Sequence, residues 1–308
     1  MQQTAGGIEA GFDLTAGRRP RSEVGESVRV PSVRAERSLV ELLALASVYL
    51  VSIGSLVGFA TFSLHPELLI RAQVSATTYA RMLVIAPRAQ ILVAVAALAL
   101  VLVRRVGARW LPAFAAIYII SLGAELAGTT VGLPFGPYRY TDGLGLKWLD
   151  HVPVLIPASW FMMALPSYAV AVRRFPVQGA RAARLACVAL GSFILLSWDL
   201  ALDPAMSFVT KYWIWGTTGP YYGMPTLNLV GWFVTGVALM IACAAMRVDR
   251  WLDEVPTPWL LGFYGANLLL PVGMNVAAGL WGAVVATGVA LAVAALLARS
   301  ASAPAVAR

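Results

Sequence analysis

Charged residues are scarce in this chain, and the residues that usually bind metals or form disulfides are almost missing. Only 12% of the 308 residues are Asp, Glu, Lys or Arg, whereas soluble domains usually carry about 25%. The two cysteines lie inside apolar runs and the two histidines are far apart, which argues against a disulfide scaffold or a zinc site. The sequence has no Walker loop, dinucleotide-binding glycine motif, HExxH motif or histidine cluster. Redox and metal chemistry are therefore disfavoured.

Long apolar runs fill most of the sequence, and 59% of the residues are hydrophobic. Repeated runs of about 18 residues or more indicate a polytopic helical membrane protein. We therefore predict an all-α fold with about eight transmembrane helices. The last apolar block is too long for one crossing, so we divide it at Pro271-Val272-Gly273. The predicted helices cover residues 38–62, 83–103, 110–130, 152–172, 184–203 and 226–246, with two more in 257–298.

The basic residues predict the orientation of these helices. Residues 1–37 are polar and Arg-rich, and we expect a disordered cytoplasmic tail before a single transmembrane domain at 38–298 and a short tail at 299–308. Of the 23 Lys and Arg residues, 17 fall on the side of the N-terminus and 6 on the other side. The positive-inside rule then places both termini in the cytoplasm of an inner or plasma membrane. Topology therefore explains the net charge of +8 better than nucleic-acid binding does.

Two inserts rich in Gly, Pro and aromatic residues interrupt the apolar pattern, at residues 125–160 and 198–232. The predicted topology places both on the same, outer side of the membrane. The first contains Gly128-Thr-Thr followed by Gly136-Pro-Tyr, and the second contains Gly216-Thr-Thr followed by Gly219-Pro-Tyr. This short echo suggests a parallel internal repeat of two helix pairs.

Four acidic residues fall within apolar runs, where ionisable groups are costly and usually face a partner or a cavity. We expect Glu41 to reach water near the start of its helix. Glu125 lies several residues inside its helix, as either a functional group or a hydrogen-bonded packing residue. Asp199 and Asp203 are spaced i, i+4 and share a helix face. Two carboxyl groups this close in low dielectric do not both ionise readily, which leaves one protonated, as a general acid requires. Alternatively, Asp203 only ends its helix before the next proline.

Aromatic residues crowd beside these acids. Belts of Trp and Tyr are common at membrane interfaces, but an aromatic cavity also stabilises a cation through the ring faces. Asn228 and Trp232 are spaced i, i+4 and are predicted to line the same cavity. The aromatic residues that we predict to bind substrate are Phe135, Tyr138, Tyr140, Trp160, Trp198, Trp213, Trp215, Tyr221, Tyr222 and Trp232.

Taken together, these residues resemble a known family, the membrane carotenoid hydratases of the CruF type. The resemblance covers roughly residues 40–298, and its motifs are specific only in combination. His151 departs from the pattern, because many relatives are expected to have Gly at this position. The motifs are Glu125-x-x-Gly128, Gly132-x-Pro134-Phe135-Gly136-x-Tyr138-x-Tyr140, Val152-Pro153-x-x-Ile156-Pro157-x-x-Trp160, Asp199-x-x-x-Asp203-Pro204, Trp213-x-Trp215 and Gly219-x-Tyr221-Tyr222-Gly223-x-Pro225-x-x-Asn228-x-x-Gly231-Trp232.

The resemblance implies that water is added across the terminal C-1,C-2 double bond of an acyclic carotenoid end group, without a cofactor. It implies a lycopene-like, γ-carotene-like or bacterioruberin-precursor-like substrate in the lipid bilayer, with other carotenoid-pathway enzymes as partners. We assign the proton donor to the Asp199 and Asp203 pair, and the activation of water to Glu125 with Asn228. The reverse assignment remains open. The alternatives are a non-catalytic carotenoid-binding or carrier membrane protein and a proton-coupled transporter.

Overall fold

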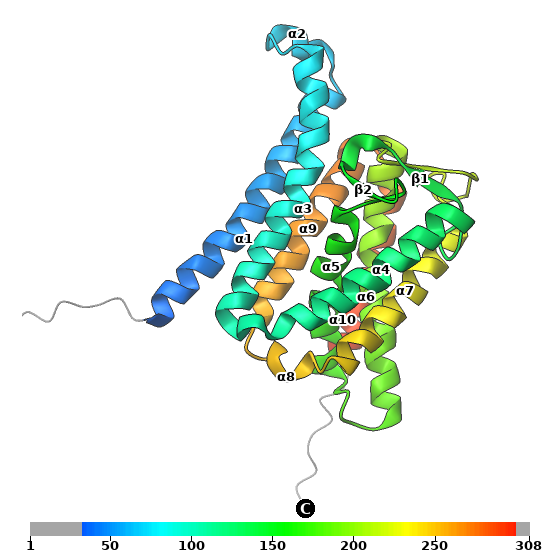
Figure 1. The fold of residues 1–308 in the computed structure, drawn as a ribbon. Helices are drawn as coiled ribbons and strands as arrows, with labels where there is room; N and C mark the ends of the chain where they lie inside the picture. Colours follow the sequence, from blue (N-terminus) through cyan, green and yellow to red (C-terminus); the bar gives the residue numbers. More distant parts are fainter. Residues whose placement is uncertain (1–32, 300–308) are drawn as a thin grey trace, which may run out of the picture.

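The computed structural model describes residues 33–299, and long helices make up most of this range (Figure 1). Shorter turns connect them, and two of these, η1 (Phe59–Ser63) and η4 (Pro204–Val209), are π-helical continuations of longer helices. Short helices α2 (Glu67–Arg71) and α8 (Asp249–Leu252) lie in connections. The long helices are α1 (Val33–Gly58), α3 (Ala76–Val106), α4 (Leu111–Val131), α5 (Leu155–Arg174), α6 (Arg181–Asp203), α7 (Thr226–Ala245), α9 (Thr257–Ala277) and α10 (Trp281–Arg299).

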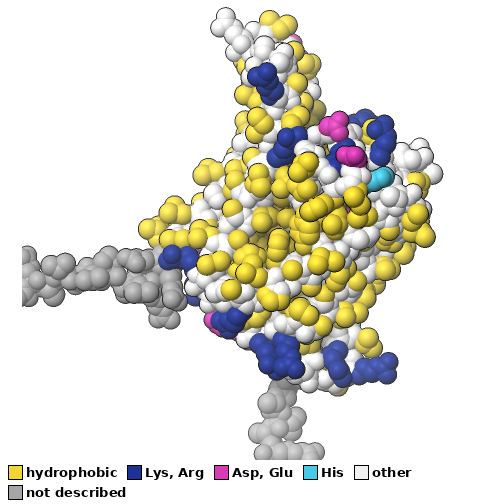
Figure 2. Space-filling model, viewed as in Figure 1, with side chains coloured by type: hydrophobic (Ala, Val, Ile, Leu, Met, Phe, Trp, Pro, Cys, Tyr) yellow, Lys and Arg dark blue, Asp and Glu magenta, His cyan; other side chains and the backbone are white. Residues whose placement is uncertain are grey.

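Seven segments of the described chain are long and apolar enough to cross a membrane. One of them, residues 76–131, contains both α3 and α4, which the turn η2 (Gly107–Trp110) separates. Gly107 has a positive φ of 62°, a conformation that glycine adopts readily. With α3 and α4 counted separately, the eight long helices match the eight predicted ones, and the polytopic helical class is confirmed. In Figure 2, Lys and Arg gather toward two ends of the visible face, and mostly hydrophobic side chains lie between them.

Two boundaries differ from those predicted. Helix α1 begins at Val33, so the last five residues of the expected N-terminal tail are helical, while residues 1–32 and 300–308 lie outside the described residues. Pro271 does not end a helix but lies inside α9, and the chain turns only after Ala277. Gly279 supplies the positive φ of 74° for that turn. Neighbouring helices can satisfy the backbone groups that a proline frees inside a membrane helix.

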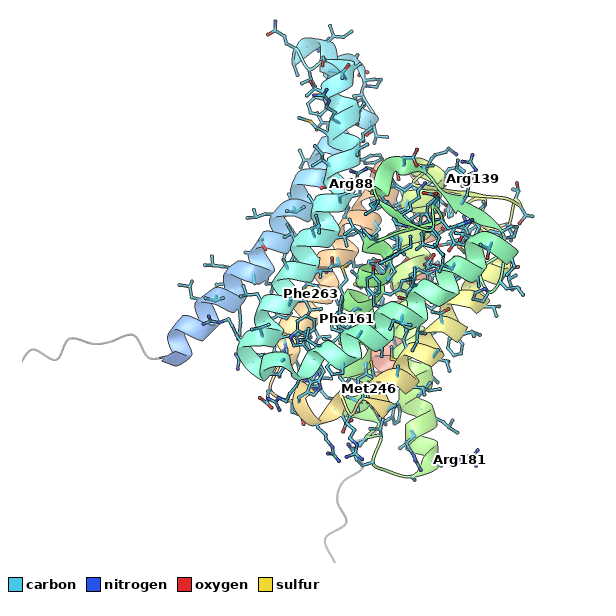
Figure 3. All side chains as sticks on the ribbon, viewed as in Figure 1. Arg88, Arg139, Phe161, Arg181, Met246 and Phe263 are labelled. Carbon is cyan, nitrogen blue, oxygen red and sulfur yellow. The ribbon has the colours of Figure 1, made fainter. Side chains whose placement is uncertain are left out.

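Helix α6 lies at the centre of the bundle, where it packs against α5, α7, α9 and α10. Helices α1 and α3 form a hairpin that packs against α9 and α5 and projects beyond them, with α2 at its tip (Figure 1). Figure 3 shows Phe161 and Phe263 inside the bundle, where both are about 1% exposed or less. Arg88 and Arg139 lie toward one end of the molecule and Arg181 toward the other (Figure 3).

The two inserts pair with each other through short strands. Strand β1 (Tyr138–Tyr140) pairs antiparallel with β4 (Trp213–Trp215), while β2 (Lys147–Trp148) pairs with β3 (Val152–Pro153). The pairing of β1 with β4 confirms that both inserts lie at the same end of the bundle, called the insert end below. The Gly-Thr-Thr echo is not structurally equivalent, because the first copy ends α4 and the second follows β4.

The prediction that Glu41 reaches water is wrong. Its side chain is buried in the first half of α1, and α1 begins at the end of the bundle opposite the inserts (Figure 1). The guanidinium of Arg105, near the end of α3, donates from Nε to Oε1 at 2.5 Å and from Nη2 to Oε2 at 2.7 Å. A bidentate pair of this kind satisfies both carboxylate oxygens without water.

Candidate active site

The β1–β4 ribbon brings four aromatic side chains together at the insert end. Tyr138 pairs with Trp215, and Tyr140 pairs with Trp213. Successive side chains of a strand point to opposite faces, so these four rings share one face. The middle residue of each strand, Arg139 or Ile214, is exposed on the other face. The ring centroids lie 5.2 Å apart for Tyr138 and Trp215 and 6.0 Å apart for Tyr140 and Trp213. The ribbon thus directs aromatic hydrogen-bond donors toward the helix ends below it.

Glu125 of α4 accepts hydrogen bonds from two of these ribbon residues and from a third aromatic residue on α5. Tyr138 Oη donates to Oε2, Tyr140 Oη donates to Oε2 at 2.9 Å, and Trp160 Nε1 of α5 donates to Oε1 at 2.8 Å. Burial, reinforced by the nearby carboxyl of Glu125, raises the pKa of both tyrosines well above the ordinary value. Both hydroxyls therefore stay protonated and remain donors.

Asp199 and Asp203 lie on α6, both about 1% exposed. Trp213 Nε1 donates to Asp203 Oδ1 at 2.7 Å, and Ser207 Oγ donates to Oδ2 at 3.3 Å. Asn228 Nδ2 of α7 donates to Asp199 Oδ2 at 2.9 Å. The other oxygen, Asp199 Oδ1, is buried and has no hydrogen-bond partner among the described residues. An unpaired buried acceptor is unusual and needs an explanation.

A cavity with a volume of about 100 Å³ lies between these groups. This volume exceeds the roughly 15 Å³ that one buried water needs. Within residues 33–299, no group of three or more His, Cys, Asp or Glu side chains is arranged to hold a metal ion. Twelve of the fourteen residues that the sequence singled out line the cavity. They are Glu125, Phe135, Tyr138, Tyr140, Trp160, Trp198, Asp199, Asp203, Trp213, Trp215, Asn228 and Trp232.

Neutral side chains make all the hydrogen bonds to these three acids that are described above. The donors are tyrosine hydroxyls, indole N–H groups, a serine hydroxyl and an amide. The ion pairs of the described chain involve other acids, such as Glu41 with Arg105 and Glu254 with Arg109. Three carboxyl groups in an aromatic cavity, with no cationic partner in the described part of the chain, are suited to proton transfer and to stabilising a positive charge.

Two glycines allow the first insert to approach the helices closely. A Cβ at Gly128 of α4 would lie 2.8 Å from the Phe135 ring, and a Cβ at Gly231 of α7 would lie 2.5 Å from it. The ring of Phe135 therefore fits only because both helices lack a side chain there. Trp160 stacks on Trp232 with centroids 4.0 Å apart, which extends the aromatic wall from α5 to α7.

Two predicted substrate-binding residues do not belong to this cavity in the described structure. Tyr221 Oη donates to the backbone carbonyl of Leu200 at 2.7 Å. Tyr222 Oη accepts from the backbone N–H of Ala283 at 3.2 Å. Both hydroxyls thus hold the second insert against α6 and α10. Their place in an aromatic-rich motif gave no sign of this, because the partners are backbone groups of distant elements.

Sequence reasoning missed two amides that line the cavity. Gln90 of α3 donates from Nε2 to Ser52 Oγ at 2.9 Å and to Asn267 Oδ1 at 3.4 Å. Trp198 Nε1 donates to the backbone carbonyl of Asn267 at 3.2 Å. The sequence signal for each of them was a single amide side chain inside an apolar run.

Arg88 also escaped the sequence reasoning. It donates to the carbonyls at residues 142 and 143 and ties the first insert to α3 (Figure 3).

Comparison with known proteins now decides the family. A family model described as "Carotenoid biosynthesis protein" matches residues 88–294, which contain all the acids and aromatics of the cavity. The chain belongs to this family. The resemblance to CruF-type carotenoid hydratases is thereby confirmed at the level of the family.

One curated relative is named bisanhydrobacterioruberin hydratase, from Haloarcula japonica. The chain is 30% identical to it over 130 residues, which cover 42% of this chain and 43% of the relative. The matched part is therefore less than half of the relative's length. No solved structure matches the chain.

Proposed function

We propose that this protein is a carotenoid hydratase that needs no cofactor. In this proposal it is a hydro-lyase that adds water across the terminal C-1,C-2 double bond of an acyclic carotenoid end group and forms a tertiary 1-hydroxy carotenoid. The family and the name of the relative support the carotenoid substrate and the hydration reaction. The observation that carries the mechanism is a buried oxygen of Asp199 that has no partner among the described residues, on a residue that lines an aromatic cavity together with two further acids.

The first step of the proposed reaction is protonation of the substrate by the Asp199 and Asp203 pair. The proton passes from Asp199 Oδ1 to C-2, the π electrons of the double bond form the new C–H bond, and C-1 becomes a tertiary carbocation. The aromatic faces of Trp160 and Trp232 and the negative charge of Glu125 lower the energy of this cation. Asp203 accepts hydrogen bonds from Trp213 and Ser207. In this proposal its closeness to Asp199 keeps one proton bound to the two carboxyl groups together.

The second step is capture of the cation by water. The water oxygen forms a bond to C-1, and the proton that it loses passes to Glu125. Glu125 Oε1 accepts one hydrogen bond, from Trp160, and a carboxylate oxygen has room for two. Asn228 donates to Asp199, so in this proposal it positions the proton donor. The next turnover requires return of the proton from Glu125 to the aspartate pair.

The proposed substrates are lycopene-like, γ-carotene-like or bacterioruberin-precursor-like carotenoids dissolved in the bilayer. The charge asymmetry supports a multi-pass protein of the inner or plasma membrane with both termini in the cytoplasm. The insert end, with the acid cavity, then faces the outer side. Such a site protonates an apolar end group while the rest of the molecule stays in lipid.

Pigment analysis in a host that makes lycopene or γ-carotene tests this proposal. Cells with the protein are expected to accumulate a product heavier by one water molecule, with a tertiary hydroxyl and an unchanged polyene absorption spectrum. Cells that contain the Asp199→Asn variant, in the same amount per membrane, are expected to keep the starting pigment. A carrier would bind pigment and leave its mass unchanged in both cases. Unchanged pigments with acyclic, monocyclic and longer carotenoids would contradict the hydratase proposal.

A further inference from the structure

A second cavity lies beside the acid cavity, between the α1–α3 hairpin and the insert end of the bundle. Its volume is about 250 Å³, more than twice that of the acid cavity. Its walls come from the end of α1 with η1, the first turns of α3, η4, and the end of α9. The family assignment and the acid cluster leave this space unexplained.

The two cavities share part of their walls. Pro87, Met206, Tyr212 and Leu270 line both of them. Tyr212 Oη donates to the backbone carbonyl of Leu83 at 2.7 Å, which fixes the ring between the second insert and α3. Side chains of four residues thus separate two spaces that are otherwise neighbours. A molecule with one end in the acid cavity can extend into the second cavity past apolar groups.

The lining of the second cavity is suited to a hydrocarbon chain. It consists mainly of apolar and aromatic side chains, among them Phe59 and Met274. The cavity also reaches the lateral surface of α3, where Met82 is 52% exposed. A long apolar chain placed here leaves the acid cavity sideways through apolar surroundings.

Two glycines of α1 leave open space along this cavity. Gly54 and Gly58 both line it, and a Cβ added at either position would meet nothing within 4 Å. Gly58 has φ −59° and ψ −43°, so its backbone accepts any ordinary side chain. Glycine is a poor choice inside a helix unless close approach is needed. Among the described residues no protein atom approaches either position, so the space beside them is open to a bound molecule.

We propose that the second cavity binds the polyene chain next to the reacting end group while that end group lies in the acid cavity. This inference rests on the proposed hydratase function and names the path of its substrate. The occupant is a long, rigid, apolar polyene, and the shared wall of Pro87, Met206, Tyr212 and Leu270 marks where the end group joins the chain. The site therefore selects for a long apolar chain as well as for the terminal double bond.

Filling the second cavity from α1 is the direct test. Gly58→Leu and, independently, Gly54→Leu place a branched side chain in the open space. Product formation from lycopene per molecule of membrane protein is expected to fall roughly tenfold or more, because even one methylene in an apolar pocket changes selectivity by about 10–200-fold. Gly58→Ala is expected to lose much less. Gly288→Leu is the matched control, since Gly288 of α10 also has nothing within 4 Å and lies outside the cavity.

A binding measurement keeps the result interpretable if the reaction itself is not observed. Asp199→Asn protein is expected to copurify with lycopene, whereas Asp199→Asn/Gly58→Leu is expected to lose the pigment and Asp199→Asn/Gly288→Leu to retain it. Equal hydration and equal pigment by the cavity-filled and control proteins would overturn the proposal and leave a lipid acyl chain as the occupant. Absence of hydration by the unsubstituted protein, together with pigment loss on filling, would overturn the hydratase function alone.

Discussion

Buried acids at the two ends of this protein are satisfied in different ways. Glu41, opposite the inserts, forms a bidentate ion pair with Nε and Nη2 of the Arg105 guanidinium. At the insert end, the donors described for Glu125, Asp199 and Asp203 are neutral hydroxyl, indole and amide groups. A carboxylate paired with arginine holds its charge in place and joins two helices. Acids with neutral donors keep the freedom to gain or lose a proton, and this separates the candidate chemistry from the structural pair.

A second contrast exists within the insert end. Both oxygens of Glu125 accept hydrogen bonds, and so do both oxygens of Asp203. One oxygen of Asp199 has no partner within residues 33–299. Glu125 and Asp203 are therefore held by a donor on each oxygen, while Asp199 is the cavity-lining acid that has an oxygen without a donor among the described residues. This difference leads us to place the proton transfer to carbon on Asp199.

The largest effect on activity is expected from Asp199→Asn. The amide has nearly the same shape but cannot deliver a proton, and a positioned general acid typically contributes about 10²–10⁴-fold to the rate. Product per molecule of membrane protein is expected to fall at least about a hundredfold, as measured by pigment analysis of membranes. Near-normal product formation at normal expression would remove Asp199 from the mechanism.

A somewhat smaller loss is expected from Glu125→Gln. The side-chain amide cannot take the proton from water, and its NH₂ group would face donors that now need an acceptor. Loss of one preorganised electrostatic contact at a reacting centre typically costs about a hundredfold in rate. The substituted protein is expected to bind lycopene like the unsubstituted one while forming product roughly a hundredfold more slowly. Loss of pigment binding together with activity would indicate a packing role instead.

Trp213→Phe tests whether the hydrogen bond from Trp213 to Asp203 contributes to the reaction. The change keeps an aromatic ring on β4 but removes the N–H group that donates to Asp203 at 2.7 Å. A hydrogen bond to a charged group contributes about 1.5–3 kcal/mol, so a decrease of roughly tenfold in product formation is expected. Trp215→Phe is the comparison variant and is expected to lose less, because Trp215 Nε1 donates at the longer distance of 3.3 Å to Ser207, which itself donates to Asp203. Equal effects of both changes would show that ring packing alone matters.

Glu41→Gln is expected to have the smallest effect on activity. It leaves Arg105 without a charged partner and weakens the contact between α1 and α3. A loss of stability of about 1–3 kcal/mol is expected, seen as a lower temperature of aggregation in detergent. Product per folded molecule is expected to stay unchanged. A change in turnover without a change in stability would mean that this end of the molecule influences the reaction.

Much of the fold follows from run length alone, because a membrane helix needs a long apolar stretch. The eight long helices lie where such stretches predicted them. The end of α9 did not follow, since Pro271 is tolerated inside a packed helix and Gly279 makes the turn. The partner of Glu41 also escaped prediction, because Arg105 lies 64 residues away on another helix.

The sequence predicted which residues form the candidate site better than it predicted how they are arranged. Acids and aromatics in an otherwise apolar sequence pointed to the cavity. The pairing of Tyr138-Arg-Tyr with Trp213-Ile-Trp joins two inserts that are far apart in sequence. Only the alternation of aromatic residues in both triplets signalled strands. The bonds of Tyr221 and Tyr222 to backbone groups had no counterpart in their side-chain pattern.

The most direct test compares Asp199→Asn with Glu41→Gln in one experiment. Both changes replace a buried carboxyl by an amide of the same shape, one at each end of the bundle. Hydrated carotenoid is measured per molecule of folded protein in the same membranes that supply lycopene. The account predicts that product almost disappears for Asp199→Asn and stays at the unsubstituted level for Glu41→Gln. Equal product from both variants, or loss only with Glu41→Gln, would contradict it.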